Sequence, residues 1–335
     1  MSTTDETILV VTSIAAPTEC MRLLAAGARE RGARFYCIGD VPSPPHFLLE
    51  GCDFLGLDEQ RKLPYHYANV APERHYARKN IGYLKAMACG AGFILETDDD
   101  NYPTAGFWDM RIANDICSVS GSGWYNVYEW FGADAWPRGF PLDRVLVPNQ
   151  GFELAASSTI KPLVWQGMVA GEPDVDAIFR LTRRQSIVFQ EAPPVVLGRG
   201  VWSPFNSQNT HWAAEAFPLM YLPATCSFRA TDIVRGYVAM RCLWEMEAGV
   251  AFSAPTAMQE RNLHDLMRDF RDEIIIYEGA ARIVSALEEL ELASQACCDN
   301  LMNCYRRLVE LKVVQPAELQ LLAAWCRDVV TLGYA

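Results

Sequence analysis

The sequence is poor in basic residues. Its 335 residues include 29 lysines and arginines against 41 aspartates and glutamates, which gives a net charge of −12. Proteins that bind the phosphate backbone of a nucleic acid usually present a basic surface. The shortage of positive charge therefore predicts that the chain does not bind nucleic acid through a broad face, although it leaves room for a local pocket that holds one nucleotide.

Long apolar runs are also missing. The first apolar stretch, residues 8–14, has the length of a strand and is much shorter than the about 20 residues of a membrane-spanning helix; no later stretch reaches that length. The residues before it, MSTTDET, are polar and acidic, unlike the basic start of a signal peptide. We therefore expect a cytoplasmic protein without a membrane span.

The sequence lacks the cysteine and histidine spacings of a zinc site. Its 11 cysteines are an odd number, and most stand singly in apolar stretches, as Cys37 and Cys242 do. This pattern is typical of reduced, buried thiols. Cys297, Cys298 and Cys304 share a helical pattern, where a metal cluster is the alternative, but no CxxC or histidine spacing supports one.

The apolar pattern that is present predicts an α/β fold. Residues 8–14 predict a buried strand, residues 17–32 a helix that ends at a glycine, and residues 33–38 a second strand. This is a βαβ opening. Residues 74–89 have helical spacing, and residues 91–97 predict a further strand.

The strand over residues 91–97 runs directly into Asp98, Asp99 and Asp100, followed by Asn101. Adjacent carboxylates repel each other, and burying them is costly unless a cation neutralises their charge. Carboxylate oxygens suit Mg²⁺ or Mn²⁺, and ligands of open α/β sheets bind beyond the carboxyl ends of the strands. The motif alone leaves three alternatives open: a metal-nucleotide site, the carboxylate site of a phosphatase or two-metal nuclease, or an acidic surface turn.

The remainder of the chain divides near residue 258. Residues 102–235 are rich in tryptophan, proline and glycine and predict a loop-rich, short-stranded half that faces the substrate. After residue 258, apolar residues recur at spacings of three and four, which predicts helices. We therefore expect a catalytic domain over residues 1–257 and a helical extension over residues 258–335. The extension either forms the surface of a homo-oligomer or packs on the core.

Several ordered segments carry a resemblance to a known family. ARKNIGYLKAMACGAGFILETDDDN (77–101) resembles the core of the plant STELLO proteins and their bacterial relatives. Later segments are similar to STELLO segments in the same order: QGMVAGEPDVDAIFRLTR (166–183), PFNSQNT (204–210) and FRATDIVRGYVAMR (228–241). GADAWPRGFPL (132–142) is similar to the segment around the reactive arginine of the related UDP-arabinopyranose mutases. Together the likeness covers about residues 6–250.

The resemblance implies a GT-A-like, Rossmann-type glycosyltransferase core with a nucleotide-diphospho-sugar donor, a UDP-sugar being favoured. It also implies Mn²⁺ or Mg²⁺ and a glycan acceptor, in glycan or polysaccharide biosynthesis. GT-A folds usually use the last carboxylate of the acidic motif for the metal and an earlier one for the ribose or sugar. Asp100 and Asp98 are therefore the implied metal ligands, and Asp98 and Asp99 the implied donor contacts. Two alternatives stay open: a UDP-sugar mutase, and an inactive scaffold in a polysaccharide-synthesis complex.

Further donor contacts are expected at the strand ends and at the front of the helix over residues 74–89. They are Thr12, Ser13, Asp40, Arg78, Lys79 and Asn80. The strand-end residues are placed to hold the base and ribose, or serve their turns. A cation at the helix front is suited to the diphosphate, although a solvated helix face is the alternative.

Two residues are expected to take part in the reaction. Asp232 is the candidate base that deprotonates the acceptor hydroxyl, or the N-cap of a helix over residues 233–246. Arg138 matches the reactive arginine of the mutases, but a guanidinium stays protonated and is a poor nucleophile, so we expect it to contact phosphate or sugar. The segment also departs from the mutase pattern by inserting Pro137 and losing the serine that follows, which argues against mutase activity.

The remaining candidates are polar and aromatic residues for sugar recognition: Asp174, Asp176, Trp202, Asn206, Gln208, Asn209 and Trp212. Amides and carboxylates suit hydroxyl groups, and indole rings suit the stacking of a sugar. For the two aspartates, capping of a helix that begins near Ala177 is the alternative.

Overall fold

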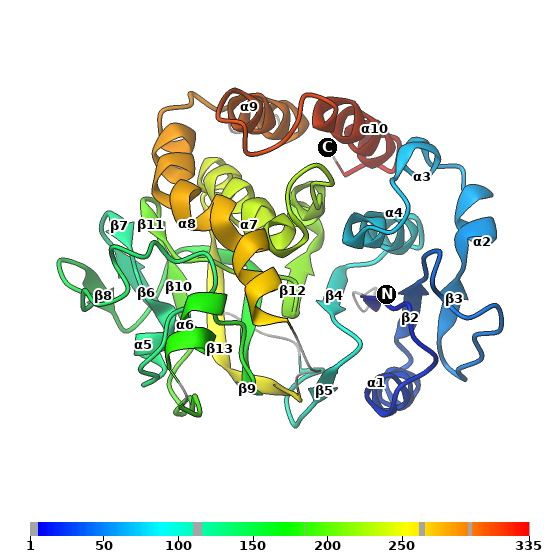
Figure 1. Cartoon of the computed structure of the whole chain (residues 1–335), viewed down its shortest axis with the longest axis horizontal. Coiled ribbons are helices and arrows are strands. Elements are labelled where there is room, and N and C mark those ends of the chain that lie inside the picture. Colours follow the sequence, from blue (N-terminus) through cyan, green and yellow to red (C-terminus); the bar gives the residue numbers. More distant parts are fainter. Residues whose placement is uncertain (1–5, 110–115, 184, 261–264, 294–296, 335) are drawn as a thin grey trace.

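The computed structural model describes residues 6–109, 116–183, 185–260, 265–293 and 297–334 (Figure 1). An 11-stranded mixed sheet runs through it in the order β3-β2-β1-β4-β12-β9-β13-β10-β6-β8, with β5 paired to β13; β7 and β11 form a separate two-stranded sheet. The strands are β1 (Thr7–Thr12), β2 (Arg34–Ile38), β3 (Asp53–Leu55), β4 (Phe93–Thr97), β5 (Asn101–Pro103), β6 (Cys117–Ser120), β7 (Gly123–Trp124), β8 (Glu153–Ala155), β9 (Lys161–Gly171), β10 (Val195–Leu197), β11 (Val201–Trp202), β12 (Asn209–Ala213) and β13 (Ala248–Gln259). The α-helices are α1 (Glu19–Glu30), α2 (Leu57–Arg61), α3 (His66–Val70), α4 (Lys79–Ala88), α5 (Val127–Trp130), α6 (Ala177–Thr182), α7 (Thr231–Leu243), α8 (Leu266–Glu288), α9 (Cys297–Glu310) and α10 (Glu318–Thr331). Four 3₁₀ helices are η1 (Tyr76–Arg78), η2 (Ala214–Met220), η3 (Phe228–Ala230) and η4 (Trp244–Met246).

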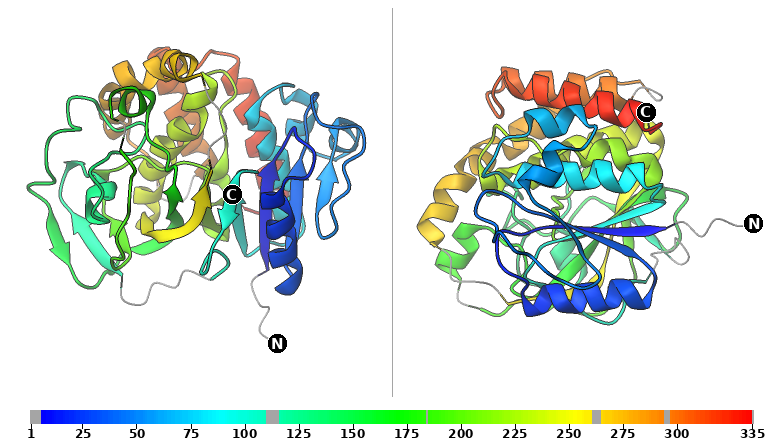
Figure 2. Two further views of the ribbon diagram at one scale, coloured as in Figure 1. Left: turned by 60° about the horizontal axis from the view of Figure 1, so that its bottom comes forward. Right: turned by 90° about the vertical axis from the view of Figure 1, so that its right-hand side faces the viewer.

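The N-terminal half is the Rossmann-type βαβ unit that the sequence predicts. β1 pairs in parallel with β2 on one side and β4 on the other, and β3 extends this edge. The apolar run of β1 is completely buried because α1 covers one face of the sheet and α4 the other, as the right-hand view of Figure 2 shows. The strand ends at Thr12, earlier than expected, and the helical pattern of residues 74–89 divides into η1 and α4.

The second half of the sheet is less short-stranded than expected. β12 runs antiparallel to β4 and β9, which reverses the chain direction in the middle of the sheet. β9 has 11 residues and β13 has 12, and they pair in parallel along most of their length. The fold is therefore a mixed α/β sheet in which β12 joins the parallel N-terminal strands to the second half.

Helix α7 and the helices after β13 cover the core. All 13 residues of α7 are buried, and α9 and α10 lie across the same side of the molecule as α4 and α7 (Figure 1). Ile283, Leu308 and Trp325, one from each of α8, α9 and α10, join the same apolar cluster as α4 and α7. Core packing is thus observed for the expected extension, whereas its separation as a domain at residue 257 and a role in oligomers stay predictions. Among the described residues, no helix is both long and apolar enough to cross a bilayer.

Two buried carboxylates of α10 bind distant backbone segments. Asp328 accepts hydrogen bonds from the backbone N–H groups of His66 and Tyr67 at the start of α3, at 2.8 Å each. Glu318 accepts from the Tyr221 hydroxyl and from the backbone N–H groups of residues 224 and 225. The last described helix therefore fixes the loop before η3 and the start of the segment before η1.

Candidate active site

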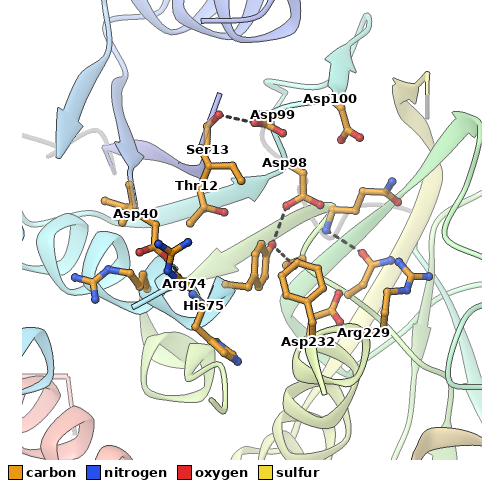
Figure 3. Close-up of a pocket in the computed structure, with 18 of the residues that line it drawn as sticks. Thr12, Ser13, Asp40, Arg74, His75, Asp98, Asp99, Asp100, Arg229 and Asp232 are labelled. Carbon is orange, nitrogen blue, oxygen red and sulfur yellow. Dashed lines mark hydrogen bonds between the residues drawn. The ribbon is translucent and has the colours of Figure 1, made fainter. Parts of the chain in front are cut away.

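A cavity of about 400 Å³ opens at the carboxyl ends of β1, β2 and β4. Figure 3 shows residues from these strand ends facing Arg229 and Asp232 across it. Twelve of the predicted site residues line the cavity: Thr12, Ser13, Asp40, Arg78, Asp98, Asp99, Asp100, Arg138, Asp174, Asn206, Gln208 and Asp232. The sheet thus brings together residues that lie up to 220 positions apart in the chain, from Thr12 to Asp232.

The strand-end residues hold their own loops in place. One carboxylate oxygen of Asp40 accepts the backbone N–H of Val41 at 2.7 Å, and the other accepts that of His75 at 2.8 Å. The Ser13 hydroxyl donates to Asp99, and its backbone N–H donates to Ile38. Asp40 and Ser13 therefore stabilise their turns and also line the cavity.

The three aspartates of the acidic motif face different partners. Asp98 accepts the Tyr76 hydroxyl at 2.7 Å and pairs with the buried ammonium of Lys79 at 3.3 Å. Asp100 accepts an N–H of Gln259 at 2.9 Å. Burial raises the pKa of Asp98 to about 6, Lys79 opposes this effect, and the charge of Asp100 adds to it. The negative charge of the motif is thus only partly neutralised by the protein.

The donor atoms of the motif fit a hard divalent cation. No group of three or more His, Cys, Asp or Glu side chains that could hold a metal ion is found within the described ranges. Mg²⁺ in nucleotide sites, however, is commonly held by one or two carboxylates, with phosphate oxygens and water completing the shell. Asp98 and Asp100 supply two such carboxylates at the cavity wall.

Arg138 forms a buried clamp with two carboxylates on the opposite wall. Its Nη2 donates to Asp174 at 2.7 Å and to Asp232 at 3.0 Å, while Nε and Nη1 make further bonds to the same two residues. Burial opposes the ionisation of Asp174, but the Arg138 and Arg229 guanidiniums outweigh it and hold its pKa well below the usual range. The side chain of Arg138 therefore fixes two carboxylates at the cavity wall, and its expected contact with phosphate or sugar stays a prediction.

The clamp is built on close packing against α7. Gly139 adopts a φ of +94°, and a Cβ there would lie 2.5 Å from a methyl carbon of Ile233. Only glycine allows this turn to approach the helix so closely. Asp232 is the second residue of α7 and not its N-cap. A carboxylate in the first turn of a helix is favoured by the helix dipole.

The residues at the front of α4 are more deeply buried than a donor contact requires. Arg78 lines the cavity, but its guanidinium donates to Gln60 and to the carbonyls of Ala71 and Pro72. Lys79 donates to the carbonyl of Thr97 and pairs with Asp98, and the amide of Asn80 both donates to and accepts from the backbone of Leu222. Lys79 and Asn80 thus support the wall from behind, which corrects their expected contact with the donor.

Four further predicted residues lie outside the cavity lining. Trp202 and Trp212 are fully buried and donate to Glu288 and Glu96, so a sugar has no exposed indole face on which to stack. Asn209 is also fully buried, with its amide bonded to Met168 and Thr256. Asp176 is the N-cap of α6, which is the capping alternative from the sequence, and it accepts N–H groups from Phe179 and Trp136.

Several lining residues were not singled out from the sequence, notably Arg74, His75, Tyr76, Ser207, Phe228 and Gln259. Tyr76 lies in the segment 74–89, whose spacing predicts only a helix, yet its hydroxyl bonds to both Asp98 and Ser207. Ser207 stands between two predicted residues, Asn206 and Gln208, and this proximity was its one available signal. The others have no predicted residue next to them in the chain.

The fold and cavity define the chain as an α/β protein of Rossmann type with an acidic pocket at the carboxyl edge of its sheet. The family model for STELLO glycosyltransferases matches residues 229–335, which include the C-terminal helices. The chain is also similar to two Arabidopsis thaliana proteins, "Probable glycosyltransferase STELLO1" and "Probable glycosyltransferase STELLO2", at 29% and 28% identity over 97% of its length. These findings confirm the resemblance of the chain to the STELLO glycosyltransferases.

These matches cover nearly all of this chain but a smaller share of the plant proteins. The chain spans 44% and 45% of the length of the two plant proteins, less than half of each. Among solved structures, the crystal structure of a mycobacterial protein matches with a TM-score of 0.37 and 9% identity, over 84% of this chain and 74% of that one. A likeness that remote carries no argument about fold or function.

Proposed function

We propose that this chain is a metal-dependent glycosyltransferase that moves a sugar from a nucleotide-diphospho-sugar, with a UDP-sugar favoured, to a hydroxyl group of a glycan. The observation that carries the proposal is the shared cavity: the ends of β1, β2 and β4, the acidic motif and Asp232 all face it. The similarity to proteins named as probable glycosyltransferases supports the same reaction class.

The residues of the two walls suit different parts of such a reaction. We assign Thr12, Ser13 and Asp40 to the base and ribose, because they line the cavity at the carboxyl edge where nucleotides bind in α/β sheets. Asp98 and Asp100 would hold Mn²⁺ or Mg²⁺, which neutralises the diphosphate as it leaves.

Asp232 is the candidate general base. It accepts the proton of the acceptor hydroxyl while the oxygen attacks the anomeric carbon and the bond to the diphosphate breaks. Arg138 and the start of α7 fix its carboxylate against the wall of the cavity. Arg138 is thus a positioning residue, and because its guanidinium pairs with two carboxylates, we do not assign it the covalent role that a mutase would need.

Calorimetric titration with UDP, GDP and CMP, in the presence of Mn²⁺ or EDTA, tests the donor class. We expect Mn²⁺-dependent binding of one nucleotide by the wild type and its loss in Asp100→Ala. Asp143→Ala, an exposed aspartate outside the cavity, is the matched control. Absence of nucleotide binding in every condition would overturn the proposal, and isomerisation of the donor sugar without an acceptor would favour the mutase.

A further inference from the structure

An exposed aromatic ring lines the cavity on the side of Asp232. Phe228 begins η3, and 59% of its surface is exposed, whereas Trp202 and Trp212 are fully buried. Ligand pockets are commonly lined by apolar and aromatic side chains, and an exposed ring within one offers a surface on which a ligand can pack. The stacking surface that the sequence assigned to the tryptophans is therefore available at Phe228 instead.

The exposed ring is held in a defined position. It packs edge-on against Tyr76, with 5.7 Å between the ring centroids and 71° between their planes. Tyr76 is itself fixed through its hydroxyl to Asp98 and Ser207. On the other side, Arg229 is paired with Glu273 at 2.7 Å, which anchors η3 to α8. A ring fixed in this way loses little conformational entropy when a ligand stacks on it.

The groups around this ring define the chemistry of its ligand. Asp232 lies one helical turn further along the chain, and the amides of Asn206 and Gln208 line the same cavity. Carboxylates and amides bind hydroxyl groups, while a phenyl ring binds an apolar C–H face. Arg138 and Arg229 on this side of the cavity are each paired with a carboxylate, so their charge is largely balanced within the protein. A neutral pyranose combines the required hydroxyls and C–H face.

We propose that Phe228 is the stacking platform of the acceptor subsite, where a neutral saccharide lies with one ring on the phenyl group and one hydroxyl toward Asp232. This inference rests on the proposed function, because it assigns the acceptor of that same reaction. The phenyl ring selects for sugars with an unobstructed C–H face, and the nucleotide binds on the other wall of the cavity.

Saturation-transfer NMR on the full chain tests this assignment, with cellotriose and maltotriose as neutral probes in the presence of UDP and Mn²⁺. Phe228→Ala should weaken binding of the better probe about 5- to 10-fold, since stacking contributes on the order of 1 kcal/mol. Phe228→Trp should retain it, and Leu48→Ala, an exposed apolar residue outside the cavity, should leave it unchanged.

Calorimetry with UDP and Mn²⁺ on the same proteins separates this inference from the proposed function. We expect nucleotide affinity within about twofold of wild type for every variant, because Phe228 is assigned to the acceptor. Unchanged saccharide binding in Phe228→Ala, or a wild type that binds UDP but neither saccharide, would overturn the assignment. A loss of UDP affinity in Phe228→Ala would place the ring in the donor subsite instead. A wild type that fails to bind any nucleotide would refute the proposed function itself.

Discussion

Replacing Arg138 by methionine tests whether charge pairing stabilises the buried clamp. Methionine keeps an apolar side chain but removes the guanidinium, so Asp174 and Asp232 lose their shared cation while only 8% of each residue is exposed. Removing one partner of a buried ion pair typically costs about 3–5 kcal/mol. We expect a loss near the lower end, about 3 kcal/mol, because Arg229 lies 3.7 Å from Asp174 and can take over part of the pairing.

Urea unfolding followed by circular dichroism measures this loss at neutral and acidic pH. The folded-state pKa of Asp174 is depressed, so its contribution is present above the unfolded pKa of about 4 and is lost as the pH falls. The gap between wild type and Arg138→Met should therefore be widest near pH 7 and narrow below about pH 4. Asp143→Ala, which changes an exposed charge, should show no such gap.

A double variant checks the assignment of the loss to uncompensated charge. Adding Asp174→Asn to Arg138→Met removes one of the two unpaired carboxylates and should recover about 1 kcal/mol or more. The reasoning is refuted if Arg138→Met stays within about 0.5 kcal/mol of wild type at pH 7, or if the double variant is less stable than Arg138→Met.

Three further changes probe the supports of the cavity. Burial raises the pKa of Asp176 to about 6. In urea unfolding, the wild type should therefore lose up to about 3 kcal/mol of stability relative to Asp176→Asn as the pH rises from about 4 to 6. A constant difference between the two proteins across that range would contradict this. Gly236→Ala places a Cβ 2.7 Å from the backbone oxygen of Phe205 and should lower the unfolding free energy by about 1–3 kcal/mol, whereas a neutral effect would show that α7 can shift. Glu318→Ala leaves the buried donors of residues 221–225 without their acceptor and should cost about 3 kcal/mol or more in the same assay, with the exposed Glu310→Ala as its control; equal stability of the two would mean that water replaces the carboxylate.

The sequence predicted the elements that depend on local pattern. The βαβ opening follows from apolar periodicity and a glycine stop, and the position of the acidic motif follows from the end of an apolar strand. Both signals lie within a few residues of the feature they predict. The expected boundaries differ by a few residues because pairing and packing decide where a strand or helix ends.

The site was predicted less completely because its contacts are long-range. The partners of Arg138 lie 36 and 94 residues away, and nothing in the segment around it shows that two carboxylates would engage the guanidinium. Trp202 and Trp212 were assigned to sugar stacking from residue type, but exposure depends on the packing of the whole core. Phe228 lies in a segment that carried the resemblance, yet its exposure is visible only in the folded chain.

The two carboxylates of α10 have a consequence for how the molecule opens. Glu318 accepts from the backbone N–H of Ala224, 94 positions earlier and shortly before Phe228. Asp328 accepts from that of Tyr67, 261 positions earlier and shortly before Arg74. Segments that open as one cooperative unit exchange their amide protons together. The backbone amides of Tyr67, Ala224 and Thr225 should therefore exchange together with those of α10. We therefore expect the last described helix and these two backbone segments to open as one cooperative unit, although they are far apart in the chain.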